Sequence, residues 1–199
     1  MITVLGIGPG SPDLMLRGTE KLLAQADLVI GSKRQLAGFD LSSEKQLVLP
    51  KLAILKKLLV EQYDQNVVLL ASGDPLLYGI GSWTLREFGS DHVTVVPGIS
   101  SIQYMFNQVG LPMNDAYFTS SHGRIPDFDF LLAHQTVGMV TDAKIGPYQI
   151  AKEVLSRHQQ RTIYIGEQLS YPEERISQLQ PEQVENKKYN MNVVIITNA

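Results

Sequence analysis

The first half of the chain alternates short apolar runs with longer amphipathic stretches. The runs are rich in β-branched residues and continuous, which is typical of strands that are buried on both faces of a parallel sheet. They cover residues 2–7, 27–31, 46–49, 67–71 and 92–96. Leucine spacing between them predicts helices over 13–25 and 51–62, and a further helix is expected over 99–109. This order predicts an α/β fold whose first sheet is mostly parallel.

The pattern changes after Gly110-Leu111-Pro112. Strands are expected over 116–121, 136–141, 162–166 and 192–197, and helices over 127–134 and 147–157. Because the last strand follows a polar stretch rather than a helix, we expect the second sheet to be mixed. The chain is thus predicted to form two α/β domains, residues 1–112 and 113–199, with a cleft between them that suits a small molecule.

Composition and charge remove several classes of function. The chain has 17 Lys and Arg against 20 Asp and Glu, a net charge of −3, which argues against nucleic acid as a partner. With no cysteine there can be no disulfide, thiolate nucleophile or Cys-ligated zinc, and a reducing cytoplasm is expected. The four histidines are not spaced as metal ligands, so no metal site is predicted.

A membrane association is not expected from this sequence. The longest apolar runs fall far short of the roughly 18 residues that a spanning helix needs. The opening residues Met1-Ile2-Thr3 lack the basic region of a secretory signal and lead directly into a strand pattern. We therefore predict a soluble, cytoplasmic protein.

A glycine-rich loop follows the first predicted strand. It reads Gly6-Ile7-Gly8-Pro9-Gly10-Ser11, and such glycines allow the backbone to approach a ligand that a Cβ atom would block. A dinucleotide fingerprint would need glycine where Ser11 stands. Pro9 and Pro12 each lack an amide donor, so the loop suits apolar or carbonyl contacts better than a phosphate. A tight turn without any ligand is the simpler alternative.

Two more loops follow strands in the same way. One is Ser72-Gly73-Asp74-Pro75, with further small residues up to Ser82, and the other is Pro97-Gly98-Ile99-Ser100-Ser101. Helix capping alone would explain either loop. Three such loops at the carboxyl ends of three strands nevertheless predict one ligand site at one edge of the sheet.

Basic residues occur in two loops that could meet an anionic ligand. His122-Gly123-Arg124 follows the first strand of the second half, and Lys33-Arg34 follows the second strand of the first half. An arginine can hold a carboxylate through two parallel hydrogen bonds. Solvated surface charge is the alternative in both cases.

Taken in order, five segments resemble the tetrapyrrole methylase family across the whole chain. They are GIGPGSPDLML (6–16), ASGDPLLYGIG (71–81), VPGISSIQ (96–103), SSHGR (120–124) and GEQLSYPEERI (166–176). The last two favour the branch of this family that acts on C5 of cobalt-precorrin-7 in cobalamin biosynthesis. The resemblance implies S-adenosylmethionine folded between the two domains, a corrinoid precursor lying over it, and transfer of a methyl group that gives cobalt-precorrin-8 and S-adenosylhomocysteine.

The resemblance also implies which positions contact these molecules. It places Pro9 beside the methyl donor, Ser72-Gly73-Asp74 and Leu77 at its amino-acid end, Ser100 and Ser101 along the pocket, and Thr141 and Leu169 near its adenine. Candidate contacts for the substrate carboxylates are His122, Arg124, Lys33 and Arg34. No catalytic acid or base is identified, because Ser32 stands where related uroporphyrinogen methylases carry an acidic residue.

Several alternatives remain open at this stage. The enzyme could methylate another position of a precorrin or another tetrapyrrole. Tyr148-x-x-x-Lys152 together with Ser32-Lys33-Arg34 also imitates an NADP-dependent short-chain reductase, and a non-catalytic corrinoid-binding module would keep the same fold. The family further implies a homodimer and, as a functional partner, a separate decarboxylase that methylates C15.

Overall fold

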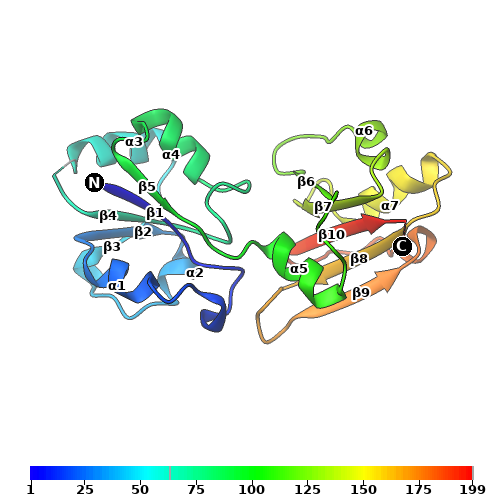
Figure 1. The fold of residues 1–199 in the computed structure, drawn as a ribbon, viewed down its shortest axis with the longest axis horizontal. Helices are drawn as coiled ribbons and strands as arrows, with labels where there is room; N and C mark the ends of the chain where they lie inside the picture. Colours follow the sequence, from blue (N-terminus) through cyan, green and yellow to red (C-terminus); the bar gives the residue numbers. More distant parts are fainter. Residues whose placement is uncertain (63, 199) are drawn as a thin grey trace. The chain divides into compact units, whose positions relative to one another are not determined.

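Two structural units, Met1–Ser100 and Ser101–Ala199, make up the chain in the computed structural model (Figure 1). The structure describes residues 1–62 and 64–198. The boundary lies at the start of helix α5 (Ser101–Val109), whereas the sequence placed it near residue 112. The reason is that α5 packs on the sheet of the second unit.

The first unit contains a parallel sheet, as predicted. Its strands are β1 (Ile2–Gly6), β2 (Leu28–Gly31), β3 (Gln46–Val48), β4 (Val67–Ala71) and β5 (Val93–Val96). They lie in the order β3-β2-β4-β1-β5, and their pairings are parallel. Strand β1 therefore lies between β4 and β5, so the loops that follow these three strands leave the sheet side by side.

Helices cover both faces of this sheet (Figure 1). One face carries α1 (Thr19–Ala24) and α2 (Lys33–Leu36), and the other carries α3 (Leu52–Glu61) and α4 (Gly81–Phe88). Strand β4 shows how the sequence feeds both layers. Val68 and Leu70 pack with the first pair of helices, whereas Leu69 packs against α3. A continuous apolar run is required because both faces are buried.

Two differences from the predicted helices have local causes. The helix expected over 13–25 is a 3₁₀ turn at Pro12–Leu14 followed by α1, which begins only after Gly18. Helix α4 was not predicted, because Gly79 and Gly81 at its start indicate a loop.

The second unit contains the mixed sheet that the sequence predicted. Its strands are β6 (Tyr117–Ser120), β7 (Thr136–Val140), β8 (Thr162–Glu167), β9 (Arg175–Leu179) and β10 (Asn192–Thr197), in the order β6-β7-β10-β8-β9. Strands β6 and β7 pair in parallel, and the other pairs are antiparallel. Strand β9 was missed because its side chains are mostly exposed and polar, so no apolar run marks it.

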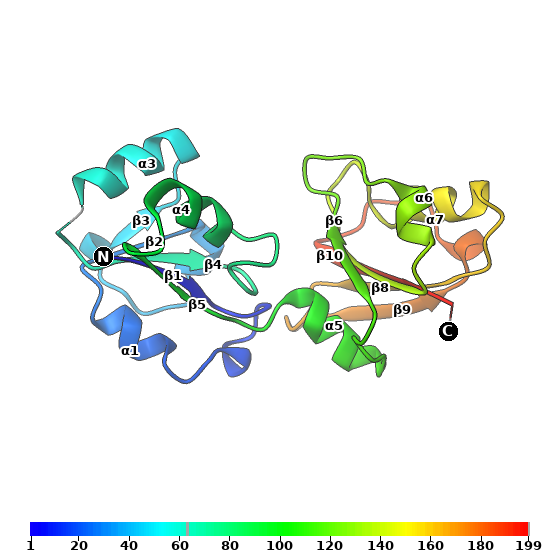
Figure 2. The same ribbon diagram turned by 45° about the horizontal axis from the view of Figure 1, so that its top comes forward.

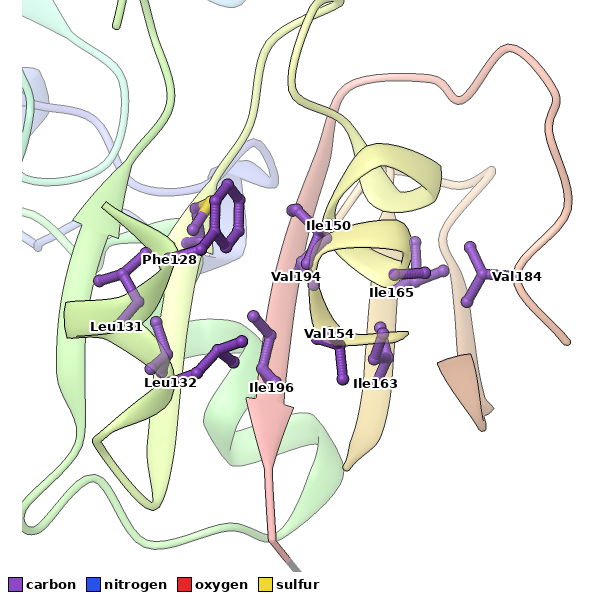
Figure 3. Close-up of a cluster of buried hydrophobic side chains, with 13 residues drawn as sticks. Phe128, Leu131, Leu132, Ile150, Val154, Ile163, Ile165, Val184, Val194 and Ile196 are labelled. Atoms are coloured by element: carbon purple, nitrogen blue, oxygen red, sulfur yellow. The ribbon is translucent and has the colours of Figure 1, made fainter. Parts of the chain in front are cut away.

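Helices also cover both faces of the second sheet. Helices α6 (Phe128–Leu132) and α7 (Pro147–Ser156) pack on one face, where Val194 and Ile196 of β10 point toward them (Figure 3). On the other face lies α5, which Figure 2 shows beside this sheet. A Cβ atom on Gly138 would lie 2.8 Å from both Ile102 Cγ2 and Phe106 Cε2. The glycine thus allows α5 to approach β7 closely, which assigns α5 to the second unit.

Candidate functional site

The loops after β1 and β4 are joined by their backbones. The Gly73 N–H donates to the Gly8 carbonyl over 2.7 Å, and the Ile7 N–H donates to the Ala71 carbonyl over 2.9 Å. Both Gly8 and Gly73 have positive φ angles, of 78° and 65°, in the region that favours glycine. The predicted meeting of these two loops is therefore confirmed by the geometry.

The loop after β5 lies against both of them. A Cβ atom on Gly6 would lie 2.6 Å from the Gly98 nitrogen and 2.8 Å from the Gly73 carbonyl oxygen. A Cβ on Gly98 would collide with the same carbonyl oxygen. No side chain fits between the three loops at this point, so glycine is required by backbone contact.

Asp74 braces two of the loops. Its Oδ1 accepts the Leu76 N–H over 2.8 Å within the loop, and its Oδ2 accepts the Gly98 N–H over 3.3 Å from the loop after β5. The carboxylate is thus held by backbone donors from both sides. A contact between Asp74 and a ligand stays a prediction.

Some small residues in the second loop have a packing role that the sequence did not reveal. A Cβ atom on Gly79 would lie 2.5 Å from the Pro75 carbonyl oxygen, and one on Gly81 would lie 2.7 Å from the same atom. These two glycines let the chain fold over Pro75 before α4 begins. They do not by themselves indicate a ligand.

Arg34 is brought to Ser72, although the sequence assigned these residues to different ligands. The Arg34 Nη2 donates to Ser72 Oγ over 2.9 Å, and partial burial lowers the pKa of the guanidinium. Gln35 Nε2 also donates to Ser72 Oγ, over 3.0 Å. The sequence analysis missed Gln35, although the spacing Ser32-x-x-Gln35 is that of a helix capping box. Lys33, in the same short helix, is exposed.

The remaining predicted positions of the first unit lie in the same loops. Pro9 is buried in the loop after β1, Leu77 is half-buried in the second loop, and Ser100 is 7% exposed at the end of the unit. Ser101 begins α5 and belongs to the second unit.

In the second unit, Asp142 holds the loop that carries His122 and Arg124. Its carboxylate accepts the backbone N–H groups of Ile145 (2.9 Å), Lys144 (2.8 Å) and Gly123 (3.3 Å). These hydrogen bonds, that from Ile145 first, lower the pKa of Asp142. Asp142 was not among the predicted site residues. Its position after a strand end was the available signal.

Arg124 lies along the end of β6, and its Nε donates to the Ser120 carbonyl over 2.8 Å. Its Nη2 donates to Thr119 Oγ1 over 2.9 Å. His122 is exposed beside it. The guanidinium is therefore oriented by the strand end rather than by an acidic partner in these bonds.

Thr141 and Leu169 follow β7 and β8, the two neighbours of β10. Thr141 is 8% exposed and donates from Oγ1 to Asn192 Oδ1 over 2.7 Å at the start of β10. Leu169 is 4% exposed and contacts Gly166, where a Cβ would lie 2.6 Å from Leu169 Cδ2. The structure thus places both residues at one edge of the second sheet.

A separate cavity lies at the opposite, amino edge of the first sheet. Its volume is about 200 Å³, and it is lined by Met1, Ile2, Leu59, Phe88, Asp91 and His92. None of the predicted site residues lines it. Across residues 1–62 and 64–198, no group of three or more His, Cys, Asp or Glu side chains is placed to hold a metal, and no helix is long and apolar enough to cross a membrane.

The backbone contact at Gly6 predicts a steric cost for any side chain. We expect Gly6→Ala to lower the free energy of unfolding by about 1–3 kcal/mol, because the new Cβ would overlap the backbone of two loops. The matched control is Gly18→Ala, since a Cβ there meets nothing within 4 Å. Urea denaturation followed by the fluorescence of Trp83 measures both variants. Equal loss of stability in the two would contradict the assignment.

Comparisons with known proteins agree with this architecture. The chain is 41% identical over 198 residues to the cobalt-precorrin-7 C(5)-methyltransferase of Salmonella typhimurium, with 98% of each chain covered. Its fold resembles the crystal structure of the precorrin-6Y methylase of cobalamin biosynthesis from Archaeoglobus fulgidus, at a TM-score of 0.78 and 20% identity over 100% of this chain and 98% of that one.

A second solved structure resembles this fold and contains a bound molecule. It is the uroporphyrin-III C-methyltransferase of Thermus thermophilus in complex with S-adenosylhomocysteine, at a TM-score of 0.76 and 24% identity, with 99% of this chain and 97% of that one covered. The family model described as tetrapyrrole (corrin/porphyrin) methylases matches residues 1–184. With that match and the full-length similarity to a curated methyltransferase, the chain belongs to the tetrapyrrole methylase family.

Proposed function

We propose that the protein transfers a methyl group from S-adenosylmethionine to C5 of cobalt-precorrin-7, giving cobalt-precorrin-8 and S-adenosylhomocysteine in cobalamin biosynthesis. The observation that carries this choice of reaction is the 41% identity over nearly the whole length to an enzyme named for it. The glycine loops at the carboxyl edge of the first sheet are the proposed place for the methyl donor.

The hydrogen bonds of these loops favour a ligand without phosphate groups. A phosphate site at such an edge needs backbone N–H groups that are available to the ligand. Here the N–H groups of Ile7, Gly73 and Gly98 already donate to protein acceptors, and Pro9 has none. S-adenosylmethionine carries no phosphate, so it fits these loops better than a dinucleotide does.

The residues proposed to hold the methyl donor bind and orient it. They are Pro9, Ser72, Gly73, Asp74, Leu77, Ser100 and Ser101, with Thr141 and Leu169 from the second unit. When bound, the sulfonium supplies a methyl group that is already activated for attack by a ring carbon. The protein then has to align the reacting atoms and exclude water more than to supply a strong base. This requirement agrees with a site built of glycines, serines and backbone carbonyls.

The reductase alternative has no support in this structure. Tyr148 and Lys152 lie on α7 in the second unit, with Lys152 Nζ 6.0 Å from the centre of the Tyr148 ring. The glycine loops that would have to hold NADP lie in the first unit and have their amides engaged, and the chain belongs to a methylase family. Methylation at another position and a non-catalytic corrinoid-binding module remain as outcomes of the experiment below.

Methyl transfer is tested directly by anaerobic incubation with S-adenosylmethionine and cobalt-precorrin-7. We expect mass spectrometry to show a corrinoid that has gained one methyl group, and labelling with a ¹³C-methyl donor to place the new carbon on C5 by NMR. A label at another ring carbon would show a different regiospecificity. Binding of both molecules without any methyl gain would contradict the proposed enzyme and favour the binding module.

Removing the brace at Asp74 should weaken the binding of the methyl donor. We expect Asp74→Ala to raise the Kd for S-adenosylhomocysteine by about tenfold, because two backbone N–H groups lose their charged acceptor and two loops separate. Calorimetric titration measures this change. Asp40→Ala, which removes an exposed carboxylate of the same unit, is the control and should bind as the wild type does. An unchanged Kd in Asp74→Ala would show that the loops do not form the site.

The substrate carboxylates are proposed to meet His122, Arg124, Lys33 and Arg34. We expect Arg124→Ala to raise the KM for the corrinoid by about tenfold while kcat changes much less, because a guanidinium–carboxylate contact is lost. The Kd for S-adenosylhomocysteine should stay constant. Arg86→Ala removes an exposed arginine of α4 and serves as the control. Steady-state kinetics in which both variants behave alike would exclude Arg124 from the substrate site.

Three further properties are proposed on narrower grounds. A cytoplasmic location is supported by the complete absence of cysteine, which suits a reducing compartment. A homodimer is proposed from the resemblance to the family. A separate decarboxylase that methylates C15 is proposed as the functional partner on the same basis.

A further inference from the structure

The Ser72 hydroxyl receives two hydrogen bonds from side chains of α2. Arg34 Nη2 donates to Ser72 Oγ over 2.9 Å, and Gln35 Nε2 donates to the same oxygen over 3.0 Å. A guanidinium and an amide nitrogen are donors only, so the serine oxygen is the acceptor in both bonds. Ser72 itself is exposed at the carboxyl edge of the first sheet, in the loop after β4.

The orientation of the Gln35 amide is fixed by the start of the helix. The Ser32 N–H donates to Gln35 Oε1 over 2.7 Å, and the Gln35 N–H donates to Ser32 Oγ over 3.3 Å, which together form a capping box. Because Oε1 has to face the Ser32 N–H, the NH₂ group has to face Ser72. Gln35 is 8% exposed, so this arrangement is enclosed by the protein.

The two bonds determine what the Ser72 hydroxyl can do. A serine hydroxyl has two acceptor positions and one donor hydrogen. Arg34 and Gln35 occupy both acceptor positions, so the hydrogen has to point away from them. Within residues 1–62 and 64–198, no protein atom accepts it. Ser72 is therefore a hydrogen-bond donor whose direction is fixed before any ligand binds.

We propose that Gln35 is a positioning residue that acts through Ser72, and that it fixes the Ser72 hydroxyl as a donor to the amino-acid carboxylate of the bound methyl donor. This inference rests on the proposed function. An anionic acceptor is favoured because the hydroxyl lies beside the guanidinium of Arg34 and can only donate. Arg34 thus contributes to the site of the methyl donor rather than only to that of the corrinoid.

The variant Gln35→Glu separates this role from helix capping. A carboxylate keeps an oxygen for the Ser32 N–H, and a Ser-x-x-Glu capping box is as suitable as Ser-x-x-Gln. Its other oxygen can only accept, so it would take the hydrogen of Ser72 and turn the hydroxyl away from the ligand. The helix start is therefore preserved while the donor is lost.

A double-mutant cycle with Ser72→Ala measures the coupling. For S-adenosylhomocysteine in calorimetric titrations, we expect Ser72→Ala and Gln35→Glu each to raise Kd by about tenfold. In the Ser72→Ala background, Gln35→Glu should change Kd by less than about threefold, which measures the direct effect of the added charge. Melting temperatures of the single variants should stay close to that of the wild type.

Two further variants make the result unambiguous. Ser32→Ala removes the Oγ cap but keeps the backbone N–H that orients Gln35, so it should lower the melting temperature and leave Kd unchanged. If Gln35→Glu does not fold, Gln35→Met replaces it in the cycle, because it removes the amide without adding charge. It should weaken binding in the wild-type background and have little effect beside Ser72→Ala.

The outcomes distinguish this inference from the proposed function. If the wild type does not bind S-adenosylhomocysteine, the proposed function fails, and this inference fails with it. If the wild type binds but a Gln35 variant changes Kd by the same factor in both backgrounds, or not at all, the inference alone is overturned. A larger effect in the presence of Ser72 than in its absence supports it.

Discussion

The contact between the backbones of three strand-end loops is the constraint on which the site depends. Parallel pairing of β4, β1 and β5 delivers the three loops to one edge, and glycine at positions 6, 73 and 98 lets them touch without side chains between them. The contact also uses up the amide donors of Gly73 and Gly98. One geometric fact thus sets both the shape of the edge and its preference for a ligand without phosphates.

The fold was predictable where burial leaves a pattern. Strands buried on both faces, such as β4, appear as continuous apolar runs, and the polar stretch before β10 correctly indicated an antiparallel arrangement. Strand β9 could not be found this way, because an exposed edge strand has no apolar run. The boundary between the units was misplaced because the contact of α5 with Gly138 joins residues far apart in the sequence, and no local signal records such a contact.

The candidate site was predictable at its loops and not at their supports. Glycines after strands indicated where ligand contact is possible, but the same residue type at Gly79 and Gly81 serves packing on Pro75. Gln35 carries no signal of its own beyond a capping box, since its approach to Ser72 depends on the adjacency of β2 and β4. Residues that act through another residue are recognised only when the fold brings them together.

Hydrogen exchange with and without S-adenosylhomocysteine tests most directly whether the carboxyl edge of the first sheet holds the methyl donor. The ligand should slow exchange in the segments 6–13, 71–81 and 96–101, which follow β1, β4 and β5. Segments at the amino edge, around the cavity that Met1 and His92 line, should exchange at the same rate in both samples. Protection confined to that amino edge, or binding without protection of the three loops, would contradict the account.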